Sequence, residues 1–347
     1  MSETQPSAAA DAPLRGEEAI IQNYLAPLAA GLPGAFGLSD DCAALSPRPG
    51  HDIVLKTDPV AEGVHFLATD DPADIGWKAL AVNVSDLAAK GATPLAYLMA
   101  LSFPEAPTRT WMARFAKGLG DAQTAFGIAL AGGDTDRRPG PLSISITVLG
   151  EVPAGRMVRR GTARAGDVLF VTGTLGAAAL GLQVRLHPAL ASQLGLSDAD
   201  FAEVVARSLR PQPRLAIREA LQAHARAAMD LSDGLAKDLG RLCRASGCGA
   251  KVDLARLPLP AAVARAIRVD AGYWQAAVAT GDDYEVLAAV APEHADAFEA
   301  VGTAAGRAAD APFSITRIGR ITAGTEPILT RPDGTAFSPQ SKGWDHF

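Results

Sequence analysis

Leu-Lys-Thr-Asp-Pro-Val-Ala-Glu-Gly-Val-His-Phe, residues 55–66, is the stretch from which the organisation of the chain is best worked out. An apolar run, residues 53–55, leads into it and is most simply a buried strand. The end of that strand would deliver Thr57, Asp58 and His65 into one loop, where strand-borne sites usually form. Asp after a strand is also common turn chemistry. This stretch alone therefore leaves both a site and an ordinary turn open.

Length, charge and cysteine content limit the class of protein. The chain has 347 residues, 48% of them hydrophobic, which is enough for two domains with a large interior. Its net charge of -6 argues against a general nucleic-acid binder, which would carry a basic stripe. The three cysteines lack the spacing of a zinc site and suit reduced thiols, and no run reaches the roughly 20 apolar residues of a membrane span. We therefore expect a cytoplasmic protein that binds neither nucleic acid nor membrane.

Hydrophobic periodicity predicts strands that alternate with helices, and hence an α/β (α+β) fold. In the first half, helices are expected over residues 16–30, 74–90 and 108–126, and strands over 95–103, 128–131 and 143–152. In the second half, a strand is expected over 168–171 and another after residues 281–285, with helices over 177–186, 198–208 and from about 228–235 to 246. An Arg- and Gly-rich stretch from about 153 to 166 indicates a boundary between them. The expected organisation is a disordered leader (1–15), an N-terminal domain (16–152) and a C-terminal domain (153–347).

Acidic residues recur beside glycine, at the ends of apolar runs or near helix starts. The clusters are Asp40/Asp41, Thr57/Asp58, Asp86, Asp134/Asp136, and Asp230/Asp233 with Asp282/Asp283. Carboxylates gathered in this way repel one another unless cations intervene, and hard oxygen ligands suit Mg²⁺ together with phosphate oxygens such as those of ATP. Neighbouring glycines would let backbone N–H groups approach phosphate, and Arg160 could grip it. Any one cluster is more often structural, but five with few basic partners in sequence favour a site.

Other common active-site chemistries find no support in the sequence. Neither a Walker glycine loop nor a Rossmann glycine motif follows an expected strand. There is no Gly-x-Ser-x-Gly elbow, and Cys42 has no base that would activate it. An ATP-dependent enzyme of this sequence would therefore not use one of the commonest nucleotide-binding folds.

A set of motifs occurs in order from about residue 16 to the end of the chain. They are Ser39–Ala44, Thr57–Asp58, Gly63–Phe66, Lys78–Ala89, Gly132–Thr135, Arg160–Gly161, Asp230–Leu235, Gly281–Glu285 and Gly343–Phe347. As a set they resemble the thiamine-monophosphate kinases, which belong to the ATP-binding superfamily that includes aminoimidazole ribonucleotide synthetase. The resemblance implies an N-terminal α/β domain that pairs across a homodimer to form a β-barrel, with a larger C-terminal α/β domain.

The resemblance also implies an activity and a set of site residues. The activity would be ATP-dependent phosphorylation of thiamine monophosphate to thiamine diphosphate by direct in-line transfer, with Asp58, Asp134 and Asp233 as the catalytic residues. Several Mg²⁺ ions would be held by Asp41, Thr57, Asp58, Asp86, Asp134, Asp230 and Asp233. ATP would contact Gly133, Asp134, Arg160 and Ser232, and thiamine monophosphate would contact His65, Asp282 and Trp344. A requirement for K⁺ stays open.

Four positions depart from the pattern of that family. Lys56 stands where a small hydroxyl residue often helps to hold metal, so one Mg²⁺ would bind differently. Ser39 replaces a usual Gly, Ala61 a frequent Glu, and Asp282 a commoner Glu, which shortens the reach to substrate. None of these changes removes a principal carboxylate.

Two other classes remain as alternatives. Selenophosphate synthetase would need a reactive Cys or selenocysteine near the N-terminus, and the hydrogenase-maturation carbamoyl dehydratase would need a C-terminal Cys; the sequence has neither. A non-catalytic nucleotide or metal sensor would bind ATP without forming ADP.

Overall fold

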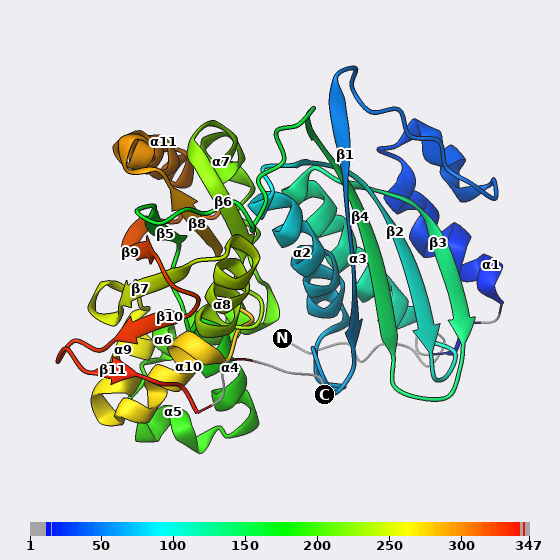
Figure 1. Ribbon diagram of the computed structural model, residues 1–347. Helices are drawn as coiled ribbons and strands as arrows, with labels where there is room; N and C mark the ends of the chain where they lie inside the picture. Colours follow the sequence, from blue (N-terminus) through cyan, green and yellow to red (C-terminus); the bar gives the residue numbers. More distant parts are fainter. Residues whose placement is uncertain (1–11, 15, 341–342, 344–347) are drawn as a thin grey trace. The chain divides into compact units, whose positions relative to one another are not determined.

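The computed structural model describes residues 12–14, 16–340 and 343, which form two compact units (Figure 1). Unit 1 runs to Leu87 and includes 94–154; unit 2 comprises 88–93 and the chain from Gly155 onward. Each unit has its own sheet and helices, which confirms the predicted α/β (α+β) class with two domains. The expected leader, residues 1–15, lies almost wholly outside the described residues.

A four-stranded sheet forms the centre of unit 1. Its strands, in spatial order, are β1 (His51–Ala61), β4 (Ser143–Pro153), β2 (Thr93–Phe103) and β3 (Ala129–Arg137). β1 runs antiparallel to β4, and β2 runs parallel to β3. In β4, Ile144, Ile146 and Val148 are buried at alternate positions. That alternation gives the sheet one apolar face for helices and one more open face.

Two long helices, α2 (Pro72–Ala89) and α3 (Arg109–Phe126), belong to unit 1 and pack against each other. Gln123 of α3 donates to the hydroxyl of the buried Tyr97 on β2, which fixes this helix on the sheet. Gly118 of α3 lies so close to α2 that a Cβ at this position would overlap the carbonyl oxygen of Ala73. The helices therefore meet backbone to backbone.

Several predicted boundaries are wrong, and the causes are local. The helix expected over 16–30 is broken into α1 (Glu17–Ile20), a π-helical turn (Ile21–Leu25) and a 3₁₀ turn (Ala26–Ala29) that includes Pro27. The helix expected to begin at Asp74 begins at Pro72, so Asp74 lies inside the first turn of α2, and Asp71 accepts the N–H of Ala73.

Strand lengths differ from the prediction as well. β1 and β3 continue through Asp58 and Asp134 because β4 and β2 supply pairing partners along their whole length. The stretch from Ala228 to Asp230 was expected to open a helix, and it lies in a strand. Strand pairing over distance, which local periodicity does not report, accounts for these differences.

Unit 2 contains a seven-stranded, mostly antiparallel sheet. In spatial order the strands are β11 (Ala336–Phe337), β10 (Pro327–Thr330), β7 (Gly249–Asp253), β9 (Ile315–Thr322), β5 (Val168–Thr172), β8 (Val286–Val290) and β6 (Ala225–Asp230). Only the β10–β7 pair is parallel among the pairings described. The helices are α4 (Ala177–Leu186), α5 (Ala189–Gln193), α6 (Asp198–Leu209), α7 (Arg218–His224), α8 (Leu235–Ser246), α9 (Ala261–Val269), α10 (Trp274–Ala279) and α11 (Ala295–Ala308).

Helices cover both faces of the middle of this sheet. In β8, Leu287 and Ala289 join the apolar cluster that includes α4 and α8, whereas Val286 and Ala288 join a second cluster with Phe298 of α11. Every residue of β8 is buried. A strand buried on both faces has a continuous apolar sequence, as this one has. No helix in the described part of the chain is both long and apolar enough to cross a membrane.

The contact between α2 and α3 predicts opposite effects for two glycines on the same helix. Gly118→Ala forces its new Cβ against the Ala73 carbonyl and should lower the free energy of unfolding by about 2 kcal/mol or more. The new Cβ of Gly120→Ala meets only the Leu28 side chain, at an ordinary contact distance of 3.5 Å, and this change should raise helix stability by up to about 1 kcal/mol. Urea unfolding of both variants measures the difference, and equal effects would contradict this account of the helix contact.

Candidate functional site

Two carboxylates of unit 1 meet at a lysine. Lys56 and Asp58 lie on the same face of β1, since their positions differ by two. The Nζ of Lys56 lies 2.9 Å from Oδ2 of Asp58 and 2.9 Å from Oδ2 of Asp86, which α2 supplies. One ammonium therefore bridges a strand and a helix through two acids.

The charges of this cluster act on one another. Burial alone would lower the pKa of Lys56, but the charges and hydrogen bonds of Asp86 and Asp58 outweigh burial and raise it. The pKa of Asp58 is also raised, by burial first and by the nearby charge of Asp86, against the opposing effect of Lys56. Two acids thus share one cation, and the cluster keeps a net negative charge.

Asn83, which the sequence analysis did not place in the site, fixes the position of Asp58. The backbone N–H of Asp58 donates to Oδ1 of Asn83 at 2.9 Å, and Nδ2 of Asn83 donates to the carbonyl of Ala79 at 3.1 Å. Asn83 is fully buried and lies three residues before Asp86, so both face β1 from neighbouring turns of α2. The spacing Asn-x-x-Asp in an apolar helical stretch is the sequence pattern from which this role of Asn83 could have been predicted.

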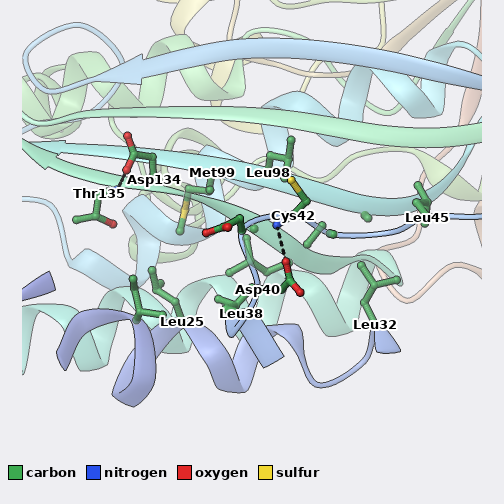
Figure 2. Close-up of a pocket in the computed structure, with 18 of the residues that line it drawn as sticks. Leu25, Leu32, Leu38, Asp40, Cys42, Leu45, Leu98, Met99, Asp134 and Thr135 are labelled. Atoms are coloured by element: carbon green, nitrogen blue, oxygen red, sulfur yellow. Dashed lines mark hydrogen bonds between the residues drawn. The ribbon is translucent and has the colours of Figure 1, made fainter. Parts of the chain in front are cut away.

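A pocket of about 560 Å³ lies within unit 1, between the N-terminal segment and the sheet (Figure 2). Its lining combines apolar side chains, among them Leu38 and Leu98, with the acids Asp40, Asp41 and Asp134. Figure 2 shows Asp40 and Leu38 contributed by the N-terminal segment and Asp134 by β3. The structure thus brings Asp41, Gly133 and Asp134 to one pocket. Its volume is in the range of small-molecule sites.

Gly133 is required by close backbone approach. A Cβ at this position would overlap the carbonyl oxygen of Met99 on β2, so no other residue fits without movement. Next to it, Oδ1 of Asp134 accepts the N–H of Thr135 at 2.9 Å. Asp134 is exposed and lies within β3, which continues beyond the strand predicted over residues 128–131.

Thr57 and His65 do not join Asp58 in one loop as expected. Thr57 lies inside β1 on the face opposite to Asp58, where its hydroxyl donates to the carbonyl of Ile146 at 3.2 Å and lies 3.0 Å from the hydroxyl of Thr147. His65 lies beyond the strand, and its Nδ1 accepts the N–H of Ala61 at 3.0 Å. Strand alternation separates the neighbours Thr57 and Asp58.

In unit 2, backbone hydrogen bonds join the loop after β6 to the loop before β8. The N–H of Asp282 donates to the carbonyl of Ser232 at 2.9 Å, and the N–H of Tyr284 donates to that of Leu231 at 2.9 Å. Asp282 has a φ of 64°, a left-handed conformation that is uncommon outside glycine. Asp230, Ser232, Asp233 and Asp282 are thereby gathered in one region of unit 2.

Basic side chains surround Asp233, contrary to the expectation that the acids have few basic partners. Its Oδ2 lies 2.6 Å from Nη1 of Arg241 and 3.5 Å from Nζ of Lys237. The buried Asp238 accepts the backbone N–H of Asp233 at 2.9 Å and pairs with Arg241 at 2.8 Å. The sequence analysis missed all three partners, although their spacing of four, five and eight residues on α8 was visible.

The remaining predicted site residues are Arg160 and Trp344. Arg160 is exposed in a loop, and its carbonyl accepts the hydroxyl hydrogen of Ser246. Trp344 lies outside the described residues.

The donor chemistry fits Mg²⁺ in part. Among the residues that the structure describes, no three His, Cys, Asp or Glu side chains lie close enough together to hold a metal ion. Mg²⁺ in proteins, however, is usually held by one or two carboxylates together with water and phosphate oxygens. Asp58 and Asp86 already converge on one cation, so pairs of acids in this chain suit a cation whose remaining ligands come from a bound phosphate.

The chain matches two family models in sequence. Residues 39–152 match the AIR synthase related protein, N-terminal domain, and residues 164–331 match the corresponding C-terminal domain. Thiamine-monophosphate kinase of Caulobacter vibrioides is 39% identical over 337 residues, covering 94% of this chain and 89% of that protein. The enzyme of the same name from Escherichia coli is 39% identical over 335 residues, covering 96% and 98%.

Solved structures are similar over nearly the same span. The thiamine-monophosphate kinase of Stenotrophomonas maltophilia has a TM-score of 0.76 at 39% identity and covers 86% of this chain and 91% of its own. A structure named AaThiL complexed with AMPPCP and TMP has a TM-score of 0.73 at 29% identity and covers 96% and 99%. HypE of Escherichia coli, at 19% identity and a TM-score of 0.74, shows a shared fold only.

The loop that carries Asp282 predicts a pH-dependent stability. Both carboxylate oxygens of the neighbouring Asp283 accept the N–H of Gly176, at 2.9 and 3.0 Å, but burial raises the pKa of Asp283 to about 7. An unfolded Asp ionises near pH 3.9, so the stabilisation from this group is complete below that pH and is lost as the pH rises to about 7. Between pH 5 and pH 7 the loss should be about 2 kcal/mol.

Asp283→Asn cannot ionise, so its free energy of unfolding should lack this decline. Asp310→Asn, an exposed position in the same unit, is the control and should follow the parent protein. Urea unfolding at pH 5 and pH 7 measures all three proteins. The same pH dependence in Asp283→Asn and the parent would show that Asp283 stays ionised in the fold.

Proposed function

The chain belongs to the AIR synthase-related family and, within it, to the thiamine-monophosphate kinases, and we propose that the carboxylate groups described above carry its reaction. The chain transfers the terminal phosphoryl group of ATP to thiamine monophosphate and forms thiamine diphosphate. The observation that carries this conclusion is 39% identity over at least 94% of the chain to enzymes of that name. The relative whose printed name includes AMPPCP and TMP supports the same pair of ligands.

The residues of the chain act by holding and positioning rather than by removing a proton. The acceptor is a phosphate oxygen that is already anionic at neutral pH, so a strong general base is not needed. Asp58, Asp134 and Asp233 are the proposed catalytic carboxylates, with Asp41, Thr57, Asp86 and Asp230 as further metal ligands. Mg²⁺, when bound, neutralises charge on the phosphate oxygens.

Different residues are proposed to contact each of the two substrates. Gly133, Asp134, Arg160 and Ser232 are proposed to contact ATP, because a glycine backbone can approach phosphate closely and a guanidinium can pair with it. His65, Asp282 and Trp344 are proposed to contact thiamine monophosphate. The thiazolium ring is a cation, which suits a carboxylate and an aromatic face.

A homodimer is proposed through the open face and edge of the unit 1 sheet. Leu55 on β1 is 65% exposed and is the register partner of Leu149 on β4. Leu98 on β2 is 42% exposed and lines the same pocket as Leu149. β1 is also one of the two edge strands of this sheet, and an exposed apolar strand at an edge is a ready template for pairing. The barrel across a dimer, implied by the family, would cover this surface.

A cytoplasmic location is also proposed. Cys42, Cys243 and Cys248 are free thiols in the structure, and reduced cysteines suit that compartment.

The activity is tested with purified protein, ATP, Mg²⁺ and thiamine monophosphate, with product identified by chromatography. Asp134→Asn keeps the side-chain size but loses the charge, and should lower the rate by about 10²-fold or more. Asp121→Asn changes an exposed acid of the same unit, paired with Lys117, and should retain the parent rate.

Two controls complete the assay. Thiamine without its phosphate should give no product, and adding K⁺ tests the open ion requirement. ATP binding without thiamine diphosphate or ADP under any condition would favour the sensor instead. Hydrolysis of ATP without phosphorylation of thiamine monophosphate would point to another member of the superfamily.

The dimer is tested by placing a charge on the proposed interface. Leu55→Asp should shift the molar mass in light scattering toward that of a single chain, because a carboxylate would be buried without a partner. Val301→Asp changes an exposed apolar residue of α11 in unit 2 and should leave the mass unchanged. A single-chain mass for the parent protein would overturn the dimer.

A further inference from the structure

Lys56 occupies a point at which a metal ion would otherwise be expected. Its ammonium lies 2.9 Å from one oxygen of Asp58 and 2.9 Å from one oxygen of Asp86. The Lys56 side chain is 33% exposed, and those of Asp58 and Asp86 are 45% and 23% exposed. The cluster is therefore partly open to solvent and to ions.

The two acids are held in place by the fold, not by the lysine alone. Asp58 lies inside β1, which pairs with β4 over eleven residues. Its backbone is bonded to the buried Asn83 of α2, the helix that also carries Asp86. Because strand and helix are tied together beside the cluster, the carboxylates cannot separate freely when the cation between them is removed.

A lysine and a divalent ion cannot share this point. Mg²⁺ binds oxygen ligands at about 2.0–2.1 Å, whereas the ammonium holds these oxygens at 2.9 Å from its nitrogen. An ion held by both Asp58 and Asp86 would have to displace Nζ from between them. While Lys56 stays, one positive charge is supplied by the chain itself.

We infer that Lys56 is a resident cation that takes the place of one divalent ion between Asp58 and Asp86. Lys56 is thus a positioning residue that sets how many metal ions unit 1 holds. This inference rests on the proposed use of Asp58 and Asp86 as metal ligands. Removing the lysine, while both acids remain, should create one additional divalent-ion site.

The test counts Mn²⁺ bound per chain, without substrates, by electron paramagnetic resonance of the free ion and by titration calorimetry. Lys56→Ser should bind one Mn²⁺ more than the parent protein, or bind it at least about 10-fold more tightly. Lys117→Ser removes an exposed lysine of the same unit and its ion pair with Asp121, and should match the parent. Equal number and affinity in Lys56→Ser and the parent would overturn the inference.

A second variant separates a new site from a general loss of structure. Lys56→Ser combined with Asp86→Asn removes one of the two ligands and should lose the additional Mn²⁺. Mn²⁺ should also raise the melting temperature of Lys56→Ser by more than that of the double variant. If both variants retain the additional ion, it binds elsewhere and the inference fails.

The ion count is independent of the kinase assay. A parent protein that forms no thiamine diphosphate would contradict the proposed function, whereas the Mn²⁺ count would still decide the role of Lys56. Conversely, an active parent protein whose Lys56→Ser variant gains no ion would support the proposed function and contradict the inferred role of Lys56.

Discussion

Carboxylates that meet at one point need positive charge between them, and this electrostatic requirement governs both units of the chain. In unit 1 the charge comes from Lys56, which lies between Asp58 and Asp86. In unit 2 it comes from Arg241, which lies between Asp233 and Asp238. In both places the cation belongs to the same strand or helix as one of its acids, so its position is fixed by regular structure.

Strand alternation decides which side chains of β1 can face the Lys56 cluster. Lys56 and Asp58 share a face of β1, and the intervening Thr57 points to the other face, toward Thr147 of β4. A chain that ended β1 before Thr57 would be free to turn all three toward one site. Because β4 pairs with β1 as far as Ala61, the fold separates the hydroxyl from the carboxylate.

Local patterns in the sequence were sufficient for the class of fold and for most elements. Helix α4 begins and ends as predicted, and the helix expected from Thr108 is α3, with Thr108 as its N-cap. Contacts between residues far apart in the sequence could not be predicted in this way. Asp86 meets Lys56 from 30 positions along the chain, and nothing in either segment alone indicates that they pair. The acids therefore seemed to lack basic partners until the strand and helix were placed together.

The two sites balance their charges in different ways. Around Asp233, the acids Asp233 and Asp238 face the two cations Lys237 and Arg241, and Asp230 and Asp282 lie in the same region of unit 2. Around Lys56, two acids face one cation, and the pocket of the same unit adds further carboxylates, Asp134 among them. Both regions therefore hold more carboxylates than cations, and an uncompensated carboxylate gains most from a nearby cation. A polyphosphate is itself an anion, so we expect it to approach either region together with metal ions.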